Sequence, residues 1–418
     1  MQEQAKASII TIGDELLIGQ VIDTNSAFIA QQLNSIGIWV NRRVAVGDNW
    51  NEIWNALDQE SRQANIILIT GGLGPTADDI TKPLLCKYFN GKMIVDESVM
   101  KHNRHLFENI FRRPFTERNQ KQAEVPDTCT VITNERGTAP AMLFEKDNCI
   151  FISMPGVPHE MKGIITQSVI PLLQQRFHGT IVAHRTLLTQ GIGESFLADH
   201  IMNWEQNLPA HIKLAYLPSY GMVRLRLTSS LTDGQTGELD NQFRLLKELV
   251  KEWMVTDEDK TIPQVVAELM KSKKRSVSLA ESCTGGYLSH LLTRDAGASE
   301  YFQGAIISYS NEIKSKVLGV EENTLNEQGA VSEETVKEMV KGALKVTGTD
   351  YALAVSGIMG PGGGSTDKPV GMVWVAAGNR ENITTRQFNF RFDRQRNIEM
   401  TANNALNVLR MFILEQEN

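Results

Sequence analysis

The stretch Asn65-Ile-Ile-Leu-Ile-Thr-Gly-Gly-Leu-Gly-Pro75 joins a continuous apolar run to a glycine-rich turn. Such a run is typical of a strand buried on both faces, as in a parallel sheet covered by helices. The run 149–154 repeats the device and ends in Pro155-Gly-Val-Pro158, and residues 8–12 form an earlier apolar run. Their alternation with amphipathic stretches predicts βαβ units around a parallel sheet over about the first 175 residues.

The pattern changes twice further along the chain. Residues 181–257 alternate like half-exposed strands at 184–190 and 222–228 and have helical spacing at 195–204 and 238–253, which predicts a small α+β module. From residue 261 the α/β rhythm resumes. Its strands are expected at residues 276–280, 305–309, 351–356, 370–377 and 384–390. We therefore expect an α/β protein with domains at residues 1–177, 181–257 and 261–416.

Composition excludes several classes of protein. The 418 residues carry a net charge of -7, which disfavours a general nucleic-acid binder. The amino terminus does not look like a signal peptide, and no apolar run approaches the roughly 18 residues of a membrane span. Cysteines are scattered without a metal-ligand spacing, at Cys86, Cys129, Cys149 and Cys283. We expect a soluble, cytoplasmic protein without a structural zinc site or a membrane partner.

The sharpest chemistry lies in Glu281-Ser-Cys-Thr-Gly-Gly286, which follows an apolar strand pattern and opens a helical one. At such a junction the backbone N–H groups near Ser282 and Thr284 point into one small space, which suits an anion or an oxyanion. The alternative interpretation is that Ser282 only caps the helix.

Lys314 lies in the first turn of the next helical pattern, five residues beyond Tyr309 in Ser308-Tyr-Ser-Asn311. A lysine near desolvating walls and a helix N-terminus is disfavoured as an ammonium, so it can take the proton of Ser282. Tyr309 would relay or orient that proton. The alternative is a solvated Lys314 and a Tyr309 at the edge of the core, and spacing alone does not separate the two interpretations.

A glycine-rich loop is the third element of this region. Ser356-Gly-Ile-Met-Gly-Pro-Gly-Gly-Gly364 contains five glycines and leads to Lys368-Pro-Val-Gly371. Glycine lets the backbone approach a ligand closely, which fits a loop around a phosphate or a sugar. Plain turn flexibility is the alternative.

These motifs together resemble the C-terminal domain of the CinA family, over about residues 262–413. The resemblance implies a nicotinamide mononucleotide deamidase that needs no cofactor and serves pyridine-nucleotide recycling. By the family pattern Ser282 is the nucleophile, Lys314 the general base and Tyr309 its partner. The resemblance also implies these substrate-binding residues: Thr284, Gly285, Gly286, Gly360, Gly362, Gly363, Arg394 and Arg396. Ile398 stands where the family often has a second arginine, which leaves open whether Arg396 supplies that charge.

The first domain suggests a second site. Gly13-Asp14-Glu15 follows the first strand pattern, and Gly71-Gly-Leu-Gly-Pro-Thr76 leaves a later one, so both loops are expected at the carboxyl edge of the sheet, where ligands bind. Asp14, Asp78 and Asp79 beside a phosphate site would make sense with a divalent cation between them. The alternative is that these carboxylates cap a turn and a helix.

Both loops, with Ser153-Met-Pro-Gly-Val-Pro-His-Glu-Met161, resemble the N-terminal domain of the CinA family, which is related to the molybdopterin-binding fold of MoaB and MogA. The resemblance implies a metal-dependent ADP-ribose pyrophosphatase that uses magnesium, manganese or cobalt. It would place Asp14, Asp78 and Asp79 at the metal. The phosphate-binding residues would be Lys82, Gly71, Gly72, Gly74 and Thr76. A pure binding module, or one that binds molybdopterin, is the alternative.

The middle module resembles the small KH-like domain of the same family, and without a Gly-x-x-Gly loop we expect a spacer or an oligomerisation role for it. Our leading hypothesis is a homodimeric hydrolase with two activities, acting on nicotinamide mononucleotide and on ADP-ribose. The competing class is an interaction protein of DNA uptake in which one or both pockets are inactive.

Overall fold

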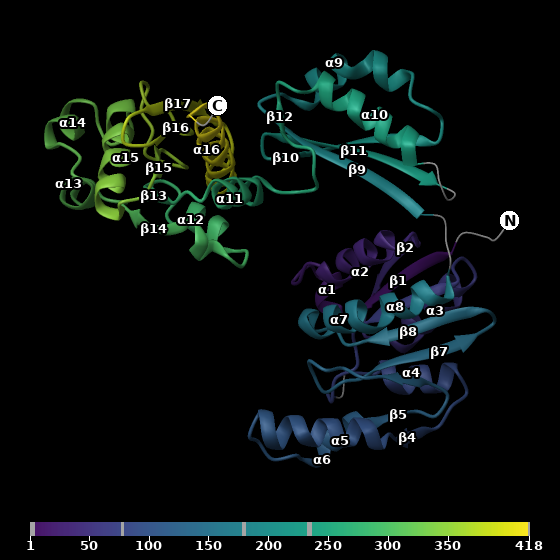
Figure 1. Cartoon of the computed structure of the whole chain (residues 1–418). Helices are drawn as coiled ribbons and strands as arrows, with labels where there is room; N and C mark the ends of the chain where they lie inside the picture. The colour runs from purple at the N-terminus through teal and green to yellow at the C-terminus, as the bar shows by residue number, and fades with distance from the viewer. Residues whose placement is uncertain (1–4, 77–78, 178–180, 232–235, 417–418) are drawn as a thin grey trace. The chain divides into compact units, whose positions relative to one another are not determined.

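A computed structural model describes residues 5–76, 79–177, 181–231 and 236–416 of the chain (Figure 1). The chain divides into two compact units. The first comprises residues 1–183 and 230–236, and the second comprises residues 184–229 and 237–418.

The first unit is built on a mixed sheet with the strand order β2-β1-β3-β8-β7-β6. The strands are β1 Lys6–Ile12, β2 Trp39–Val46, β3 Ile66–Thr70, β6 Thr130–Ile132, β7 Ala141–Lys146 and β8 Cys149–Met154. β2, β1, β3 and β8 run parallel, whereas β7 and β6 add antiparallel strands at one edge. Every residue of β3 is buried, as its apolar sequence predicts.

Helices cover both faces of this sheet. The helices of this unit are α1 Asp14–Leu17, α2 Thr24–Ser35, α3 Trp50–Ser61, α4 Thr81–Tyr88, α5 Glu97–His105, α6 Glu117–Gln120, α7 Pro158–Ile164 and α8 Ile170–Arg176, of which α5 and α6 lie with β4 and β5 rather than on the sheet (Figure 1). Short 3₁₀ or π-helical turns span Leu106–Ile110, Lys121–Ala123 and Ile165–Val169, and β4 Met93–Val95 pairs with β5 Glu124–Pro126. Ile53 of α3 and Leu84 of α4 pack on one face, and Leu33 of α2 and Leu173 of α8 on the other.

The second unit begins with the α+β module. Its sheet has the order β10-β11-β9-β12, and two helices accompany it (Figure 1). The elements are β9 Ile181–Gln190, α9 Glu194–Gln206, β10 Ile212–Ser219, β11 Met222–Leu231, α10 Thr236–Leu249 and β12 Met254–Thr256. β10 and β11 form an antiparallel hairpin that is continuously paired from Ile212↔Ser229 to Ser219↔Met222.

The rest of this unit is a second α/β domain with the strand order β14-β13-β15-β16-β17. Its strands are β13 Val277–Glu281, β14 Phe302–Ile307, β15 Tyr351–Gly357, β16 Met372–Gly378 and β17 Ile383–Asn389. Its helices are α11 Ile262–Lys273, α12 Tyr287–Thr293, α13 Asn311–Leu318, α14 Glu322–Glu327, α15 Glu333–Thr347 and α16 Arg394–Gln416, with a 3₁₀ turn at Ala298–Glu300. β13 runs parallel to β14 and β15, whereas β16 and β17 are antiparallel.

Alternation along β13 and β15 separates two cores in this domain. Leu279 and Leu353 face α11, α12 and α16, whereas Ala280 and Ala354 face α13 and α15. On that side the sheet contributes small alanine side chains, and the larger side chains of the core, such as Met339 and Leu344, come from α15. Because β13, β14 and β15 run parallel, their carboxyl ends meet at one edge of the sheet.

The structure confirms the α/β fold and most expected elements. The caps also match: Thr261 and Gln264 form a capping box at the start of α11, and Ser332 caps α15. The strand predicted at residues 305–309 was placed too far toward the carboxyl terminus. β14 spans Phe302–Ile307, and Tyr309 lies in the loop that follows it. The strands β2, β6 and β7 and the α5 region lacked a decisive pattern in the sequence.

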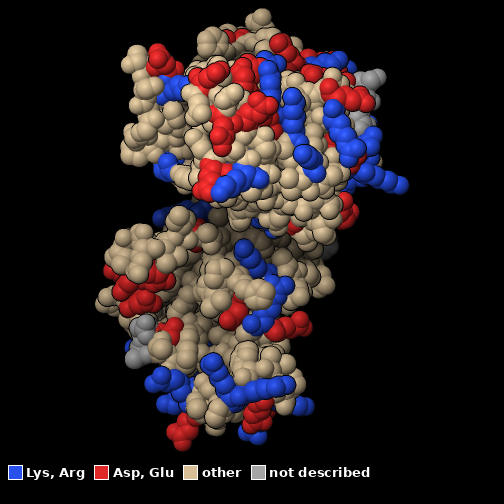
Figure 2. Space-filling model, turned by 90° about the vertical axis from the view of Figure 1, so that its left-hand side faces the viewer, with Lys and Arg blue, Asp and Glu red and all other residues tan. Residues whose placement is uncertain are grey.

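None of the helices in the described residues combines the length and the apolar character that a membrane crossing requires. On the face shown in Figure 2, lysine and arginine side chains are interspersed with aspartate and glutamate side chains. This face therefore presents charges of both signs.

Replacement of Ser332 by alanine should lower the free energy of unfolding by about 1 kcal/mol, because the Ser332 hydroxyl accepts a hydrogen bond from the Thr335 amide, at 3.2 Å. Urea denaturation would measure the change. Ser299→Ala, an exposed serine of the same domain, is the control. Equal stability of the two variants would contradict the capping role.

Candidate active site

Ser282 follows the last residue of β13, at the carboxyl edge of the sheet. Its backbone amide donates to the Val355 carbonyl of β15 at 3.1 Å, so the serine is tied to the neighbouring strand. The side chain is buried, and only 8% of the residue is exposed. This fixed and shielded position is the kind that a nucleophile needs.

Lys314 reaches Ser282 from the helix α13. Its Nζ lies 3.0 Å from Ser282 Oγ, 2.7 Å from the Ser308 carbonyl oxygen and 3.5 Å from the Tyr309 carbonyl oxygen. A neutral amine has two N–H groups and one lone pair. With the N–H groups directed at the two carbonyls, the lone pair is free to accept the Ser282 proton.

Burial also favours the neutral form of this lysine. Only 1% of Lys314 is exposed, and desolvation lowers the pKa of its ammonium group. In the part of the chain that the structure describes, no carboxylate forms an ion pair with Lys314. The predicted serine and lysine are therefore brought together in the geometry of a nucleophile and its base.

The carboxylate of Glu281 occupies the start of α12. It accepts hydrogen bonds from the Thr284 hydroxyl at 2.7 Å and from the amides of Gly286, Leu288 and Ser289 at 2.9–3.1 Å. The expected nest of amides is thus filled largely by the protein's own anion. Thr284 Oγ1 and the Gly286 amide are engaged by Glu281, which corrects their expected role as direct substrate ligands.

Two amides beside Ser282 remain available. Among the described residues, no other residue offers an acceptor to the amides of Cys283 and Thr284. Both directly follow the nucleophile, which is where an oxyanion hole is commonly built. The anion-binding space expected near Ser282 and Thr284 therefore has fewer N–H donors than the sequence predicted.

Tyr309 contributes differently from the expectation. Its hydroxyl accepts a hydrogen bond from Arg394 at 3.2 Å, and 63% of the residue is exposed. Only its backbone carbonyl contacts Lys314. The expected partnership of the phenol with Lys314 is thus not present, because the residue has passed the end of β14 and its side chain turns outward.

A pocket of about 230 Å³ surrounds the pair. It is lined by Ser282, Cys283, Tyr309, Asn311, Lys314, Ala330, Val331, Ser356, Gly357, Met359 and Arg394. Arg394, the first residue of α16, also donates to the Gly360 carbonyl at 2.9 Å. The lining of this pocket does not include the expected binding residues Gly285, Gly286, Gly362 and Gly363. Gly360 does not line it either, but its carbonyl accepts the hydrogen bond from Arg394, which does.

Arg396 and Ile398 lie away from the Ser282 pocket. The Arg396 guanidinium stacks 4.1 Å from the centre of the Phe392 ring and lines another hollow, and Ile398 packs against the hydrophobic core. Successive helical positions point in different directions, so Arg396 cannot take the place of Arg394. Of the two arginines expected to bind substrate, the structure brings only Arg394 to the pocket.

Several pocket residues were missed in the sequence. Val331 carries no motif of its own, Asn311 was recognised only as the last residue of Ser308-Tyr-Ser-Asn311, and Ser356 only as the start of the glycine loop. Lys368 indirectly positions Val331, since its ammonium donates to the Val331 carbonyl at 2.8 Å and to the Gln328 carbonyl. The Lys368-Pro-Val-Gly motif was therefore the sequence feature that pointed to the part of the pocket lined by Val331.

The loops of the first unit also meet at the carboxyl edge of their sheet. The Gly71 amide donates to the Met154 carbonyl at 3.2 Å, and the Asn25 side chain donates to the Gly156 carbonyl at 2.7 Å. Gly71 and Gly72 have φ of 117° and 63°, which only glycine adopts readily. Within the described residues the amides of Gly72 and Gly74 have no acceptor.

The acidic residues of this loop region are already engaged. Asp14 and Asp48 each accept a hydrogen bond from the other's amide, both at 3.1 Å, and Asp79 accepts from the Thr76 amide at 2.9 Å. Asp78 lies outside the described residues. Among those that are described, no group of three or more His, Cys, Asp or Glu side chains could hold a metal. The described carboxylates therefore provide no complete metal site.

Lys82 is displaced from its expected phosphate-binding position. It is buried, and its ammonium donates to the Gln122 and Glu124 carbonyls at 2.7 and 3.2 Å. Burial lowers its pKa to about 8, while the charges of Glu124, Cys129 and Asp79 oppose that shift. As the second residue of α4, it points toward the interior and ties the helix to β5.

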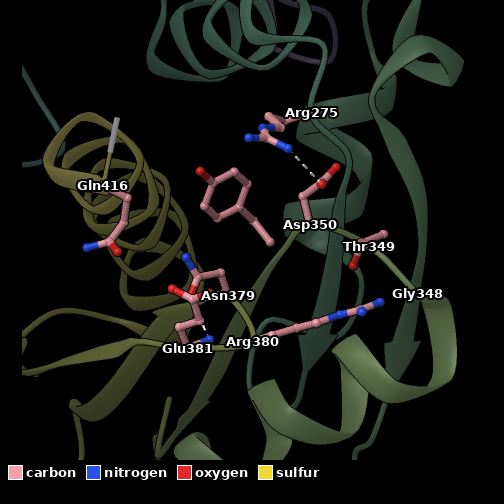
Figure 3. A pocket seen from close by; sticks show the side chains of 9 residues that line it. Arg275, Gly348, Thr349, Asp350, Asn379, Arg380, Glu381 and Gln416 are labelled. Atoms are coloured by element: carbon pink, nitrogen blue, oxygen red, sulfur yellow. Dashed lines mark hydrogen bonds and ion pairs between the residues drawn. The ribbon is translucent and has the colours of Figure 1, made fainter. Parts of the chain in front are cut away.

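A larger polar hollow of about 610 Å³ lies at the amino ends of β13 and β15 (Figure 3). Arg275 and Asp350 face each other there, with Nη1 and Oδ1 3.3 Å apart. Ligands in open α/β sheets bind at the carboxyl ends of the strands, and this hollow contains no nucleophile paired with a base. We therefore regard the smaller Ser282 pocket as the candidate active site.

The three parts of the chain match three family models. Residues 8–175 match the model of a probable molybdopterin binding domain, residues 184–252 the damage-inducible protein CinA KH domain, and residues 259–413 the CinA C-terminal domain. The architecture is that of a mixed α/β protein with a molybdopterin-binding-like domain, a KH-like domain and a CinA C-terminal domain.

Full-length relatives agree with these matches. The CinA-like protein of Flavobacterium psychrophilum is 43% identical over 98% of this chain and 99% of the relative. The CinA-like protein of Cytophaga hutchinsonii is 41% identical over 99% and 100%. A putative competence-damage inducible protein of Caldicellulosiruptor bescii is 38% identical over 98% and 99%. The chain belongs to the CinA family.

Replacement of Glu281 by glutamine should lower the free energy of unfolding by about 2–4 kcal/mol, because the amide group places a donor against buried donors that now face a carboxylate. Urea denaturation would measure the loss. Glu312→Gln, which breaks only an exposed ion pair with Lys316, is the control and should change stability by less than about 0.5 kcal/mol. A stable Glu281→Gln variant would contradict the role of the carboxylate.

Proposed function

We propose that the C-terminal domain is a nicotinamide mononucleotide deamidase, which hydrolyses the carboxamide to nicotinic acid mononucleotide and ammonia. The observation that carries the proposal is the 3.0 Å contact between Ser282 Oγ and Lys314 Nζ inside a shielded pocket. Membership of the CinA family and the resemblance of the site motifs to its C-terminal domain support the choice of substrate.

Acylation would start with attack of Ser282 Oγ on the carboxamide carbon while Lys314 accepts the hydroxyl proton. The amides of Cys283 and Thr284 are the available donors for the oxyanion that develops. Collapse of the tetrahedral intermediate breaks the C–N bond, and Lys314 returns the proton to the leaving ammonia.

Hydrolysis of the acyl-enzyme would use the same base. Lys314 takes a proton from water, the hydroxide attacks the acyl carbon, and the C–O bond to Ser282 breaks as the proton returns to Oγ. Arg394 and the Tyr309 hydroxyl stand at the pocket wall, where they can bind the part of the nucleotide remote from the carboxamide. No metal or organic cofactor takes part in this scheme.

The variants Ser282→Ala and Lys314→Met should each lower kcat/KM for nicotinamide mononucleotide by at least about 10³-fold, because the nucleophile and its base act as one unit. Ammonia and nicotinic acid mononucleotide would be measured with the full chain. Lys316→Met, an exposed lysine of the same helix, is the matched control. Turnover by the Ser282→Ala variant at the wild-type rate would refute the mechanism.

The pH dependence follows from the state of Lys314. Since burial lowers the pKa of this lysine, the base-active neutral form should appear below the ordinary lysine pKa of 10.5. We expect kcat/KM to rise with pH along a limb whose apparent pKa lies below 10.5 and to fall as the pH drops below that pKa. A rate independent of pH across this range would contradict the assignment of Lys314 as the base.

For the N-terminal domain we propose a nucleotide-diphosphate hydrolase acting on ADP-ribose with Mg²⁺, Mn²⁺ or Co²⁺. Support comes from the family resemblance and from the amides of Gly72 and Gly74 at the carboxyl edge of the sheet, which have no acceptor among the described residues and suit a phosphate. The described carboxylates do not form a metal site, so no catalytic step is assigned to the ion.

The full chain with the Ser282→Ala substitution should release AMP and ribose 5-phosphate from ADP-ribose only after one of the three metals is added. Chromatography of the products would measure this, with an EDTA-treated sample as the reference. Asp14→Asn should reduce the rate, because the family resemblance places Asp14 at the metal, whereas the exposed Asp147→Asn should leave it unchanged. Inactivity with all three metals would refute the hydrolase proposal for this domain.

A further inference from the structure

The β10–β11 hairpin of the KH-like domain ends in a tight turn at Tyr220-Gly221. Tyr220 and Gly221 have φ of 42° and 78°, so both adopt the left-handed conformation of a two-residue hairpin turn. The strands stay paired up to Ser219 and Met222, directly before and after this turn. The tip is therefore a defined structural element.

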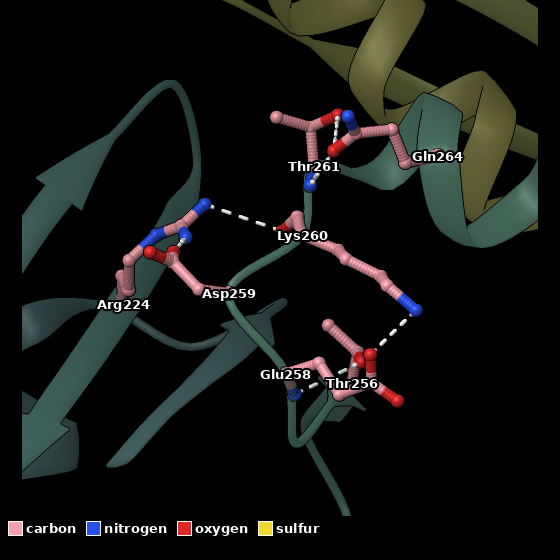
Figure 4. Close-up of polar contacts among 7 residues, drawn as sticks. All are labelled: Arg224, Thr256, Glu258, Asp259, Lys260, Thr261 and Gln264. Atoms are coloured by element: carbon pink, nitrogen blue, oxygen red, sulfur yellow. Dashed lines mark hydrogen bonds and ion pairs between the residues drawn. The ribbon is translucent and has the colours of Figure 1, made fainter. Parts of the chain in front are cut away.

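The hairpin belongs to the same compact unit as the C-terminal domain. Leu188 and Val255 of the KH-like domain share a hydrophobic core with Ile262 of α11, and Met222 packs against that core. In the linker, the Arg224 guanidinium contacts the Asp259 carboxylate and the Lys260 carbonyl (Figure 4). These contacts fix where the hairpin lies against the C-terminal domain.

The tip contacts the first turns of α16. A Cβ atom on Gly221 would come 2.9 Å from Met400 Cε. Beside it, the nearby Glu399 carboxylate raises the pKa of the Tyr220 phenol. Tyr220, Arg396 and Glu399 line one hollow of about 540 Å³. The hairpin thus supports α16 from the side of Glu399 and Met400.

A different face of α16 points to the Ser282 pocket. Arg394 donates to the Gly360 carbonyl at 2.9 Å and Asn397 donates to the Met359 carbonyl at 3.0 Å. Three and seven residues after Arg394, Asn397 and Thr401 continue this face at helical spacing, and Thr401 Oγ1 lies 3.9 Å from Met359 Sδ. Met359 and Arg394 both line the Ser282 pocket.

The first turns of α16 are therefore held between the hairpin tip and the glycine loop, while residues 391–396 are exposed. We propose that Tyr220 is a positioning residue of the C-terminal site: the KH-like domain, through its hairpin tip, holds α16 so that Arg394 stays at the pocket. This inference rests on the proposed deamidase function. It assigns the KH-like domain a part in substrate binding by a neighbouring domain.

The test compares Tyr220→Ala with Phe196→Ala in the full chain. Phe196 is an exposed aromatic residue of the same domain, on α9, so its removal controls for loss of surface area. Tyr220→Ala should raise KM for nicotinamide mononucleotide roughly three- to tenfold and change kcat less than about twofold, because Ser282 and Lys314 do not lie on α16. Phe196→Ala should leave both constants unchanged.

A double-mutant cycle separates positioning from general stability. Arg394→Ala should also raise KM, and adding Tyr220→Ala to it should produce little further rise, because the residue that Tyr220 positions is already gone. A KM for Tyr220→Ala equal to that of Phe196→Ala would overturn the inference. So would full additivity with Arg394→Ala.

A second readout does not require turnover. If the folded wild-type protein does not deamidate nicotinamide mononucleotide, the proposed function fails, and amide hydrogen exchange over residues 394–401 then tests the hairpin contact alone. Faster exchange there in Tyr220→Ala than in Phe196→Ala supports the positioning role. Equal exchange in the two variants overturns it.

Discussion

The buried carboxylate of Glu281 is the group on which the Ser282 site depends. An ionised carboxylate out of contact with water is strongly unfavourable unless donors surround it. Here the donors are the amides at the start of α12 and the hydroxyls of Thr284 and Ser289, all within eight residues of Glu281. Their geometry forces a tight turn between β13 and α12, and Ser282 lies inside that turn.

The same turn determines which donors are left for a substrate. Because Glu281 takes the amides of Gly286, Leu288 and Ser289, the amides of Cys283 and Thr284 are the ones that remain beside the serine. Donors stabilise an oxyanion only when they are directed at the position that it occupies in the transition state. Next to Ser282 in the chain, Glu281 is therefore surrounded by its own donors, and the amides of Cys283 and Thr284 are left for a substrate.

The two buried lysines show that burial alone does not make a base. Desolvation lowers the pKa of both Lys82 and Lys314, and backbone carbonyls accept hydrogen bonds from both Nζ atoms. Lys82 has only carbonyl partners among the hydrogen bonds described, whereas Lys314 also lies 3.0 Å from a hydroxyl that it can deprotonate. Lys82 therefore ties α4 to β5, and Lys314 has the position of a catalytic group.

The sequence by itself determined the α/β fold and most of the central elements, and the resemblance of its motifs to the CinA family predicted the pairing of Ser282 with Lys314. Apolar runs followed by glycine turns, and helix caps such as Ser332, act over a few residues and can therefore be read locally. Tertiary structure decided which residues share a pocket: it brought Arg394 to Ser282, turned the Tyr309 phenol away from Lys314 and buried Lys82. It also set the Tyr220 hairpin against α16. These outcomes depend on contacts between residues far apart in the chain, whose geometry only the packed elements define.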